Sequence, residues 1–160
     1  MMPAARAMPT AVGLAQLDAD REWRELARRL ADPAADVRAL ACGDDGAVWI
    51  GTEGGGLQRA EAGGGLEVER HDPADPDSLG DDRVRALAVG EGALWVGTAS
   101  GLERRDAAHF TADGPRANSA RAVDPRVRQV AVDAVHDRVF ALTTHDFGTI
   151  SPSSGRFSEV

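Results

Sequence analysis

The sequence has no lysine and no tyrosine, and its only cysteine is Cys42. A single cysteine excludes an intramolecular disulfide and a zinc site made of several cysteines. We expect Cys42 to be a small buried side chain. The net charge is −8 at pH 7, and all 18 Lys or Arg positions are arginine. This acidic balance disfavours nucleic acids and anionic membranes as general partners, because the surface would repel phosphate. The composition still allows a locally basic face.

Long apolar runs are also absent. No stretch approaches the roughly 20 apolar residues needed to cross a bilayer. Residues 1–20 lack the continuous apolar core of a secretory signal. We therefore expect a soluble, cytoplasmic chain.

What the sequence does contain is an internal repeat. The segment VRALA at 37–41 returns at 84–88 and, more loosely, at 127–131, which gives spacings of 47 and 43 residues. The segment VWIGT at 48–52 returns as LWVGT at 94–98 and in degenerate form at 139–143. A fixed period of this size indicates a solenoid or a propeller.

Within each copy, short runs of β-branched and aromatic residues alternate with turn residues, which predicts strands. The Asp45-Gly46 pair predicts a tight hairpin, because glycine takes the positive φ that such turns need. A helical solenoid is disfavoured, since the repeated motif carries glycine and lacks helical periodicity. The predicted strands are 37–42, 46–52, 56–61 and 66–70 in the first copy, 84–89, 93–98, 101–105 and 109–112 in the second, and 127–133, 138–144, 147–151 and 156–160 in the third.

Four short antiparallel strands in a radially repeated unit describe a propeller blade. The predicted fold is therefore all-β, a partial β-propeller of about three four-stranded blades plus an N-terminal half-blade. Residues 10–14 followed by Asp18 match residues 98–102 followed by Asp106, which places the outer half of a blade at 10–30. The alternative for this segment is an amphipathic capping helix at 21–30. The predicted boundaries are 1–36 for the N-terminal segment, 37–83, 84–126 and 127–160 for the blades.

Three and a half blades do not close a ring, because closed propellers have four to eight. Exposed blade faces would make an open array poorly soluble. We expect one of three explanations: a fragment or misassigned start of a longer gene, self-association that completes the propeller, or an N-terminal helix over the open end.

The combined motifs resemble the two-component regulator propeller repeat. The resemblance rests on WIGT at 49–52, GGGL at 54–57 and the DPDSL connection at 75–79. It covers residues 37–112 well and the rest loosely. It implies a non-enzymatic, ligand-sensing or protein-interaction module from the extracytoplasmic sensor of a hybrid regulator, and a periplasmic location if the chain is a fragment of such a sensor.

Two alternatives to this function stay open. A propeller lyase of the streptogramin-inactivating type uses a catalytic histidine and a metal, and it would require His109 or His145 to face the channel. The other alternative is an inactive gene fragment. No serine elbow, zinc-protease motif or phosphate-binding glycine loop accompanies the histidines, so we expect no enzyme activity, no cofactor and no metal. The acidic connection at 71–82 is expected to be mainly a turn-forming link.

Three arginines share one repeat position, at the start of the innermost predicted strand: Arg38, Arg85 and Arg128. Symmetry predicts a basic rim at one end of the channel that could bind a carboxylate, uronate or phosphate, or more generally a small anionic or carbohydrate ligand. The simpler alternative pairs these arginines with Asp36, Asp82 and Asp124. The residues expected to build the structural core of the repeat are Trp49, Gly51, Thr52, Trp95, Gly97, Thr98 and Phe140.

Overall fold

The computed structural model describes only strands and turns, which confirms the all-β prediction for this part of the chain. A helix suited to crossing a membrane is not found among these residues. The described residues are 7–10, 13–16, 36–61, 65–90, 92–106, 126–133, 135–136, 138–145, 147–150 and 157–159.

The strands form four antiparallel sheets, and within each sheet their spatial order follows the chain. The predicted strand at 109–112 lies outside the described residues. The sheets consist of β1 (Ala7–Thr10) and β2 (Gly13–Gln16); β3 (Val37–Cys42), β4 (Val48–Thr52), β5 (Leu57–Ala60) and β6 (Leu66–Glu69); β7 (Val84–Gly90), β8 (Ala93–Thr98) and β9 (Gly101–Asp106); β10 (Val127–Asp133), β11 (Arg138–Thr143), β12 (Phe147–Ile150) and β13 (Phe157–Glu159).

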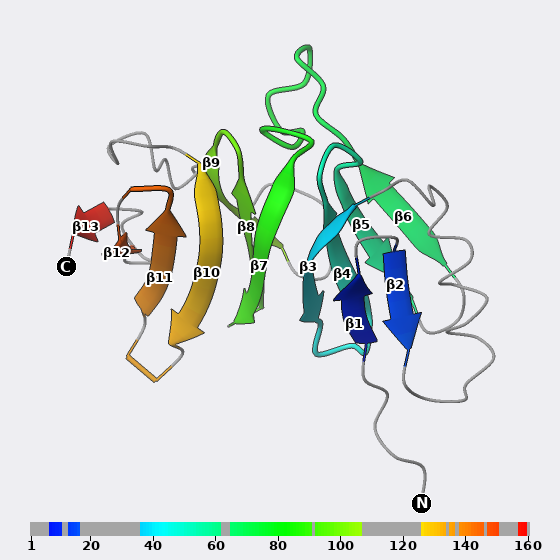
Figure 1. Ribbon diagram of the computed structural model, residues 1–160, viewed down its shortest axis with the longest axis horizontal. Coiled ribbons are helices and arrows are strands. Elements are labelled where there is room, and N and C mark those ends of the chain that lie inside the picture. Colours follow the sequence, from blue (N-terminus) through cyan, green and yellow to red (C-terminus); the bar gives the residue numbers. More distant parts are fainter. Residues whose placement is uncertain are drawn as a thin grey trace, which may run out of the picture.

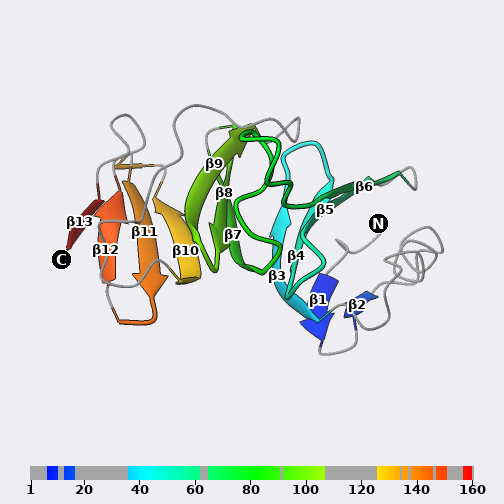
Figure 2. The ribbon, with the colours of Figure 1, turned by 90° about the horizontal axis from the view of Figure 1, so that it is seen from above.

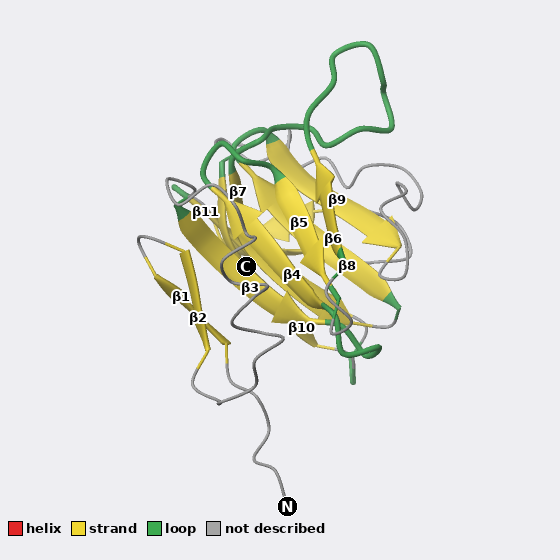
Figure 3. Ribbon diagram, turned by 90° about the vertical axis from the view of Figure 1, so that its right-hand side faces the viewer, coloured by secondary structure: helices red, strands yellow, loops and turns green. Residues whose placement is uncertain are grey.

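The sheets follow one another in an arc (Figure 2), and the first strands β3, β7 and β10 lie next to one another on its inner side (Figure 1). We call the three larger sheets blades 1, 2 and 3. The hairpin β1–β2 stands beside blade 1 (Figure 3), and β1 contacts β3 as β4 contacts β7. Its pairing of Thr10 with Gly13 repeats that of Thr98 with Gly101. The hairpin thus corresponds to the second and third strands of a blade; residues 21–30, the alternative helix, lie outside the described residues.

Two clusters of buried side chains fill the spaces between the blades. Trp49 is fully buried between blades 1 and 2, and Trp95 takes the same position between blades 2 and 3. Because indoles are large and apolar, each contributes much of the area that its interface removes from water. Phe140 replaces the tryptophan in blade 3. It is only partly buried and stacks on Phe147 with ring centroids 6.0 Å apart.

Two glycines let neighbouring blades approach closely. A Cβ atom on Gly51 would lie 2.7 Å from Val84 Cγ1, and one on Gly97 would lie 2.6 Å from Val127 Cγ1. Such distances are well inside van der Waals contact, so the repeated valine of each following blade packs directly on glycine backbone.

Cys42 is exposed, so the prediction of a buried side chain is wrong. Cys42 is the last residue of β3 and lies outside all three clusters of buried side chains. The turn that follows uses glycine as predicted, with φ of 82° at Gly46.

Candidate functional site

The three repeated arginines all lie on β-bulges. In blade 1 the pairing with β4 passes from Val37 directly to Ala39, so Arg38 is the extra residue of the bulge. The same irregularity occurs around Arg85 and around Arg128. A bulge redirects a side chain away from the regular alternation of the strand, and bulges are frequent beside functional sites.

The three arginines converge on one cavity. Arg38, Arg85 and Arg128, together with Glu53, line a cavity of about 360 Å³. We call this cavity the rim site. Its volume falls within the range of roughly 300–1,000 Å³ that small-molecule sites occupy. The structure thus brings the three repeat-related arginines to one cavity, and ligand binding there stays a prediction.

Glu53 is the residue that sequence reasoning missed. The backbone N–H of Glu53 donates to the Asp36 carbonyl at 2.9 Å. Glu53 also forms an isolated antiparallel β-bridge with Arg83. These backbone contacts hold Glu53 beside the residues at which β3 and β7 begin. The repeat gave no signal for it, because alanine and threonine follow the corresponding threonines, Thr98 and Thr143.

Glu53 forms a two-point ion pair with Arg85. The Arg85 Nε and Nη2 groups donate to the two Glu53 carboxylate oxygens at 3.1 and 2.8 Å. Arg38 Nε lies 3.9 Å from Glu53 Oε2. The hydrogen bonds from Arg85 hold the pKa of Glu53 below its usual range, despite the opposing effect of burial. Glu53 is therefore ionised at neutral pH.

The expected pairing with aspartates holds for one arginine and fails for another. Arg38 pairs with Asp36, whereas Arg85 pairs with Glu53 and not with Asp82. Asp124 lies outside the described residues. Within the described part of the chain, the exposed Arg128 has no ion-pair partner. The described carboxylates thus leave the Arg128 guanidinium at the rim site without a neutralising charge.

The other sequence candidates do not line the rim site. His145 is exposed and its N–H donates to Thr143 Oγ1 at 3.4 Å, while His109 lies outside the described residues. His71 Nδ1 donates to the Leu79 carbonyl at 2.6 Å, inside the acidic connection. Among the residues described, no group of three or more His, Cys, Asp or Glu side chains is arranged to hold a metal ion.

No family model and no curated protein matches the sequence. Solved structures do match in fold. The extracellular domains assigned to the hybrid two-component systems BT3049 and BT4673 of B. thetaiotaomicron align with 98% and 97% of the chain, at 14% and 19% identity and TM-scores of 0.72 and 0.69. Virginiamycin B lyase of Staphylococcus aureus aligns with 93% of the chain at 15% identity, with a TM-score of 0.62.

These similarities establish the propeller fold. The chain spans 23% and 20% of the two sensor structures and 48% of the lyase. At these identities the likeness concerns the arrangement of the strands and not the chemistry of any site. The predicted partial propeller is thus confirmed, and the resemblance to two-component sensor propellers is supported at the level of fold.

Proposed function

We propose that the chain is a non-enzymatic sensing module that binds a small anionic ligand at the rim site. The observation that carries the proposal is Arg128, a guanidinium without an ion-pair partner in the described part of the chain, beside a cavity of about 360 Å³. Arginine binds carboxylate and phosphate through paired hydrogen bonds. The fold shared with extracellular domains of two-component systems supports a sensing role and an extracytoplasmic location.

The charges around the rim site favour a singly charged ligand. Three guanidinium groups line the cavity, and two carboxylates pair with them, Glu53 with Arg85 and Asp36 with Arg38. Among the described residues, one positive charge is left, at Arg128. A monoanion neutralises it, whereas a dianion would bring a second negative charge close to Glu53. We therefore propose a monocarboxylate, such as a sugar acid, as the ligand class.

Isothermal titration calorimetry with glucuronate and glucose tests this proposal, because the two sugars differ in the carboxylate. We expect glucuronate alone to bind, with an affinity that falls as salt is added. A charge-assisted hydrogen bond contributes about 1.5–3 kcal/mol, so Arg128→Ala should weaken binding roughly 10- to 100-fold. Glu53→Gln should admit inorganic phosphate, because it removes the repelling charge.

Arg138→Ala is the matched control. Arg138 is half exposed, pairs with Asp133 and lies at the opposite end of blade 3. The Arg138→Ala variant removes the same charge from the chain and should leave the affinity for glucuronate unchanged. Equal binding of glucose and glucuronate, or equal weakening by both arginine variants, would contradict the proposed site.

The lyase alternative has no supporting observation among the described residues, since the rim site is lined by arginine and glutamate. Incubation with a streptogramin and analysis of the products by mass spectrometry tests it directly. We expect the substrate to be recovered intact.

A further inference from the structure

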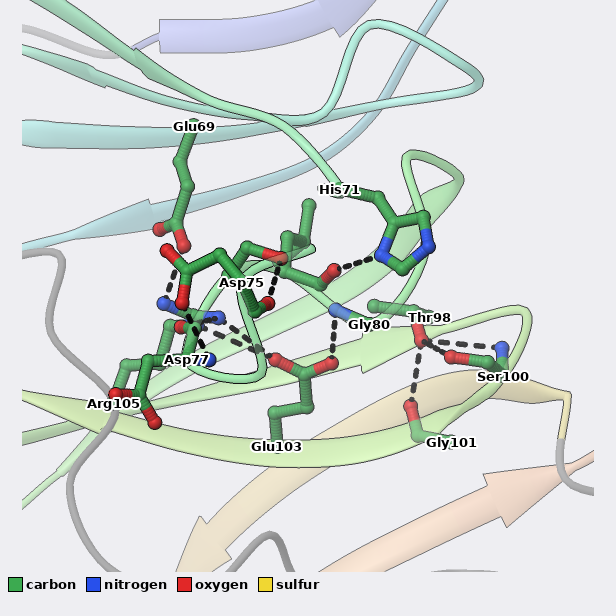
Figure 4. Close-up of polar contacts among 12 residues, drawn as sticks. Glu69, His71, Asp75, Asp77, Gly80, Thr98, Ser100, Gly101, Glu103 and Arg105 are labelled. Atoms are coloured by element: carbon green, nitrogen blue, oxygen red, sulfur yellow. Dashed lines mark hydrogen bonds and ion pairs between the residues drawn. The ribbon is translucent and has the colours of Figure 1, made fainter. Parts of the chain in front are cut away.

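A buried ion cluster connects blade 1 to blade 2 (Figure 4). Arg105, on β9, has only 1% of its side chain exposed and donates from Nη1 to Glu69 Oε1, on β6, at 2.6 Å. Its Nε and Nη2 groups donate to Glu103 Oε2 at 3.3 and 3.1 Å. One guanidinium thus joins carboxylates from two different blades.

The same cluster holds the chain connection between the blades, residues 70–83. Glu103 Oε1 accepts a hydrogen bond from the Gly80 N–H at 2.6 Å, and Arg105 Nη2 donates to the Asp77 carbonyl at 3.3 Å. Leu79, between these two contacts, is fully buried. We call the cluster of Glu69, Glu103 and Arg105 the clasp, because it fixes the connection to blade 2.

A blade of this fold does not require these charges. The register of the strands places Arg105 where Ala60 stands in blade 1 and Ile150 in blade 3, and both of those side chains are buried and apolar. Replacing a buried ion cluster by apolar side chains is often neutral or stabilising. Packing alone therefore does not account for Arg105.

The charges of the clasp are also unbalanced. Two carboxylates with 16% and 6% of their side chains exposed, Glu69 and Glu103, share a single guanidinium. The excess negative charge is buried, which is costly unless a proton is taken up. Glu103 uses both oxygens as acceptors, whereas Glu69 Oε2 is buried and has no hydrogen-bond partner among the residues that the structure describes. Glu69 Oε2 is thus the atom that can carry the proton.

The charged groups around Glu69 agree with this assignment. Burial is the main cause that raises the pKa of Glu69 to about 7; the charges of Glu103 on β9 and Asp75 in the connection act in the same direction, and Arg105 opposes them. Below this pH the clasp contains one balanced ion pair and a neutral carboxyl group. Above it, two carboxylates compete for Arg105.

We propose that the clasp responds to pH. It holds the connection 70–83 on blade 2 when Glu69 is protonated, and the connection detaches from blade 2 when Glu69 is ionised in alkaline solution. The sign follows from linkage. An acid that is more easily protonated in the folded state stabilises the fold at low pH, and that contribution is lost as the pH rises through the pKa of the folded state.

Hydrogen exchange of the full chain at pH 6 and pH 8, corrected for intrinsic rates, tests the proposal. We expect protection within 70–83, at the Gly80 amide above all, to fall several-fold between pH 6 and pH 8. Glu69→Gln imitates the protonated side chain and should keep its protection at both pH values. The segment 127–143, in blade 3, serves as the internal reference.

Two further variants make the test specific. Glu67→Gln changes an exposed carboxylate on the same strand, away from Arg105, and should behave as the wild type. Glu103→Gln removes the competing charge, so an ionised Glu69 then pairs alone with Arg105, and the protection of 70–83 should no longer fall between pH 6 and pH 8. Equal protection of the wild type at pH 6 and pH 8, or the same loss in Glu69→Gln, would overturn the proposal.

Discussion

The contact between Gly51 and the next blade gives the sharpest test of how the sheets pack. In Gly51→Ala the added Cβ atom would lie 2.7 Å from Val84 Cγ1 and 3.1 Å from the Val84 carbonyl oxygen. Overpacking of this kind costs about 1–3 kcal/mol, because blade 2 must shift or Val84 must leave its rotamer. For a chain of this size each kcal/mol lowers Tm by roughly 2–4 °C. We expect Tm to fall by roughly 2–12 °C in thermal unfolding followed by circular dichroism.

Two variants separate this clash from other effects of losing a glycine. In Gly65→Ala the new Cβ meets only the flexible end of Glu61, at 2.9 Å, so Tm should stay unchanged or rise slightly. Combining Gly51→Ala with Val84→Ala removes the atom nearest to the new methyl group. The double variant should be less destabilised than the sum of the single variants, by about 0.5–3 kcal/mol. Strict additivity would refute the packing argument.

Two other outcomes are expected. Leu79→Ala should lower the free energy of unfolding in urea by about 2–5 kcal/mol, because a fully buried leucine leaves a cavity, whereas Val68→Ala, at a half-exposed position, should change it by less than about 0.5 kcal/mol. Self-association stays one of three open explanations: if it completes the propeller, light scattering coupled to size exclusion should show a discrete dimer at several concentrations, whereas a monomer that unfolds cooperatively would contradict ring completion between chains.

The strands were predictable because each repeat carries its own local signals. The hairpin glycine, Gly46, and the short runs of β-branched and aromatic residues between turn residues are properties of neighbouring positions, so β3 to β5 begin and end within two residues of the prediction. The burial of Cys42 was predicted wrongly, because residue type alone does not tell where a strand leaves the packed region. That depends on how far the neighbouring sheet extends.

The rim site was predictable only in part. Repetition identified Arg38, Arg85 and Arg128, because a residue kept at one position in every blade must face the same way. The bulges that redirect them depend on how β3, β7 and β10 meet their partner strands, and a sequence pattern with period two gives no sign of them. A glutamate stands at this repeat position only in blade 1, so a comparison of repeated positions does not identify Glu53.

In a repeat protein, the residues that differ from their counterparts in the other blades are therefore distinct in role from the repeated ones. The repeated residues build the scaffold, since Gly51 and Gly97 make the same close contact at successive interfaces. Glu53 and Arg105 have no charged counterpart of the same kind in the other blades, and each introduces charge where the scaffold does not need it. The connection 70–83 physically links the two: the Asp82 carbonyl accepts hydrogen bonds from Gly54 and Gly56, next to Glu53, while the clasp holds the same connection at Gly80. The clasp and the rim site are thus joined by a short, hydrogen-bonded length of chain.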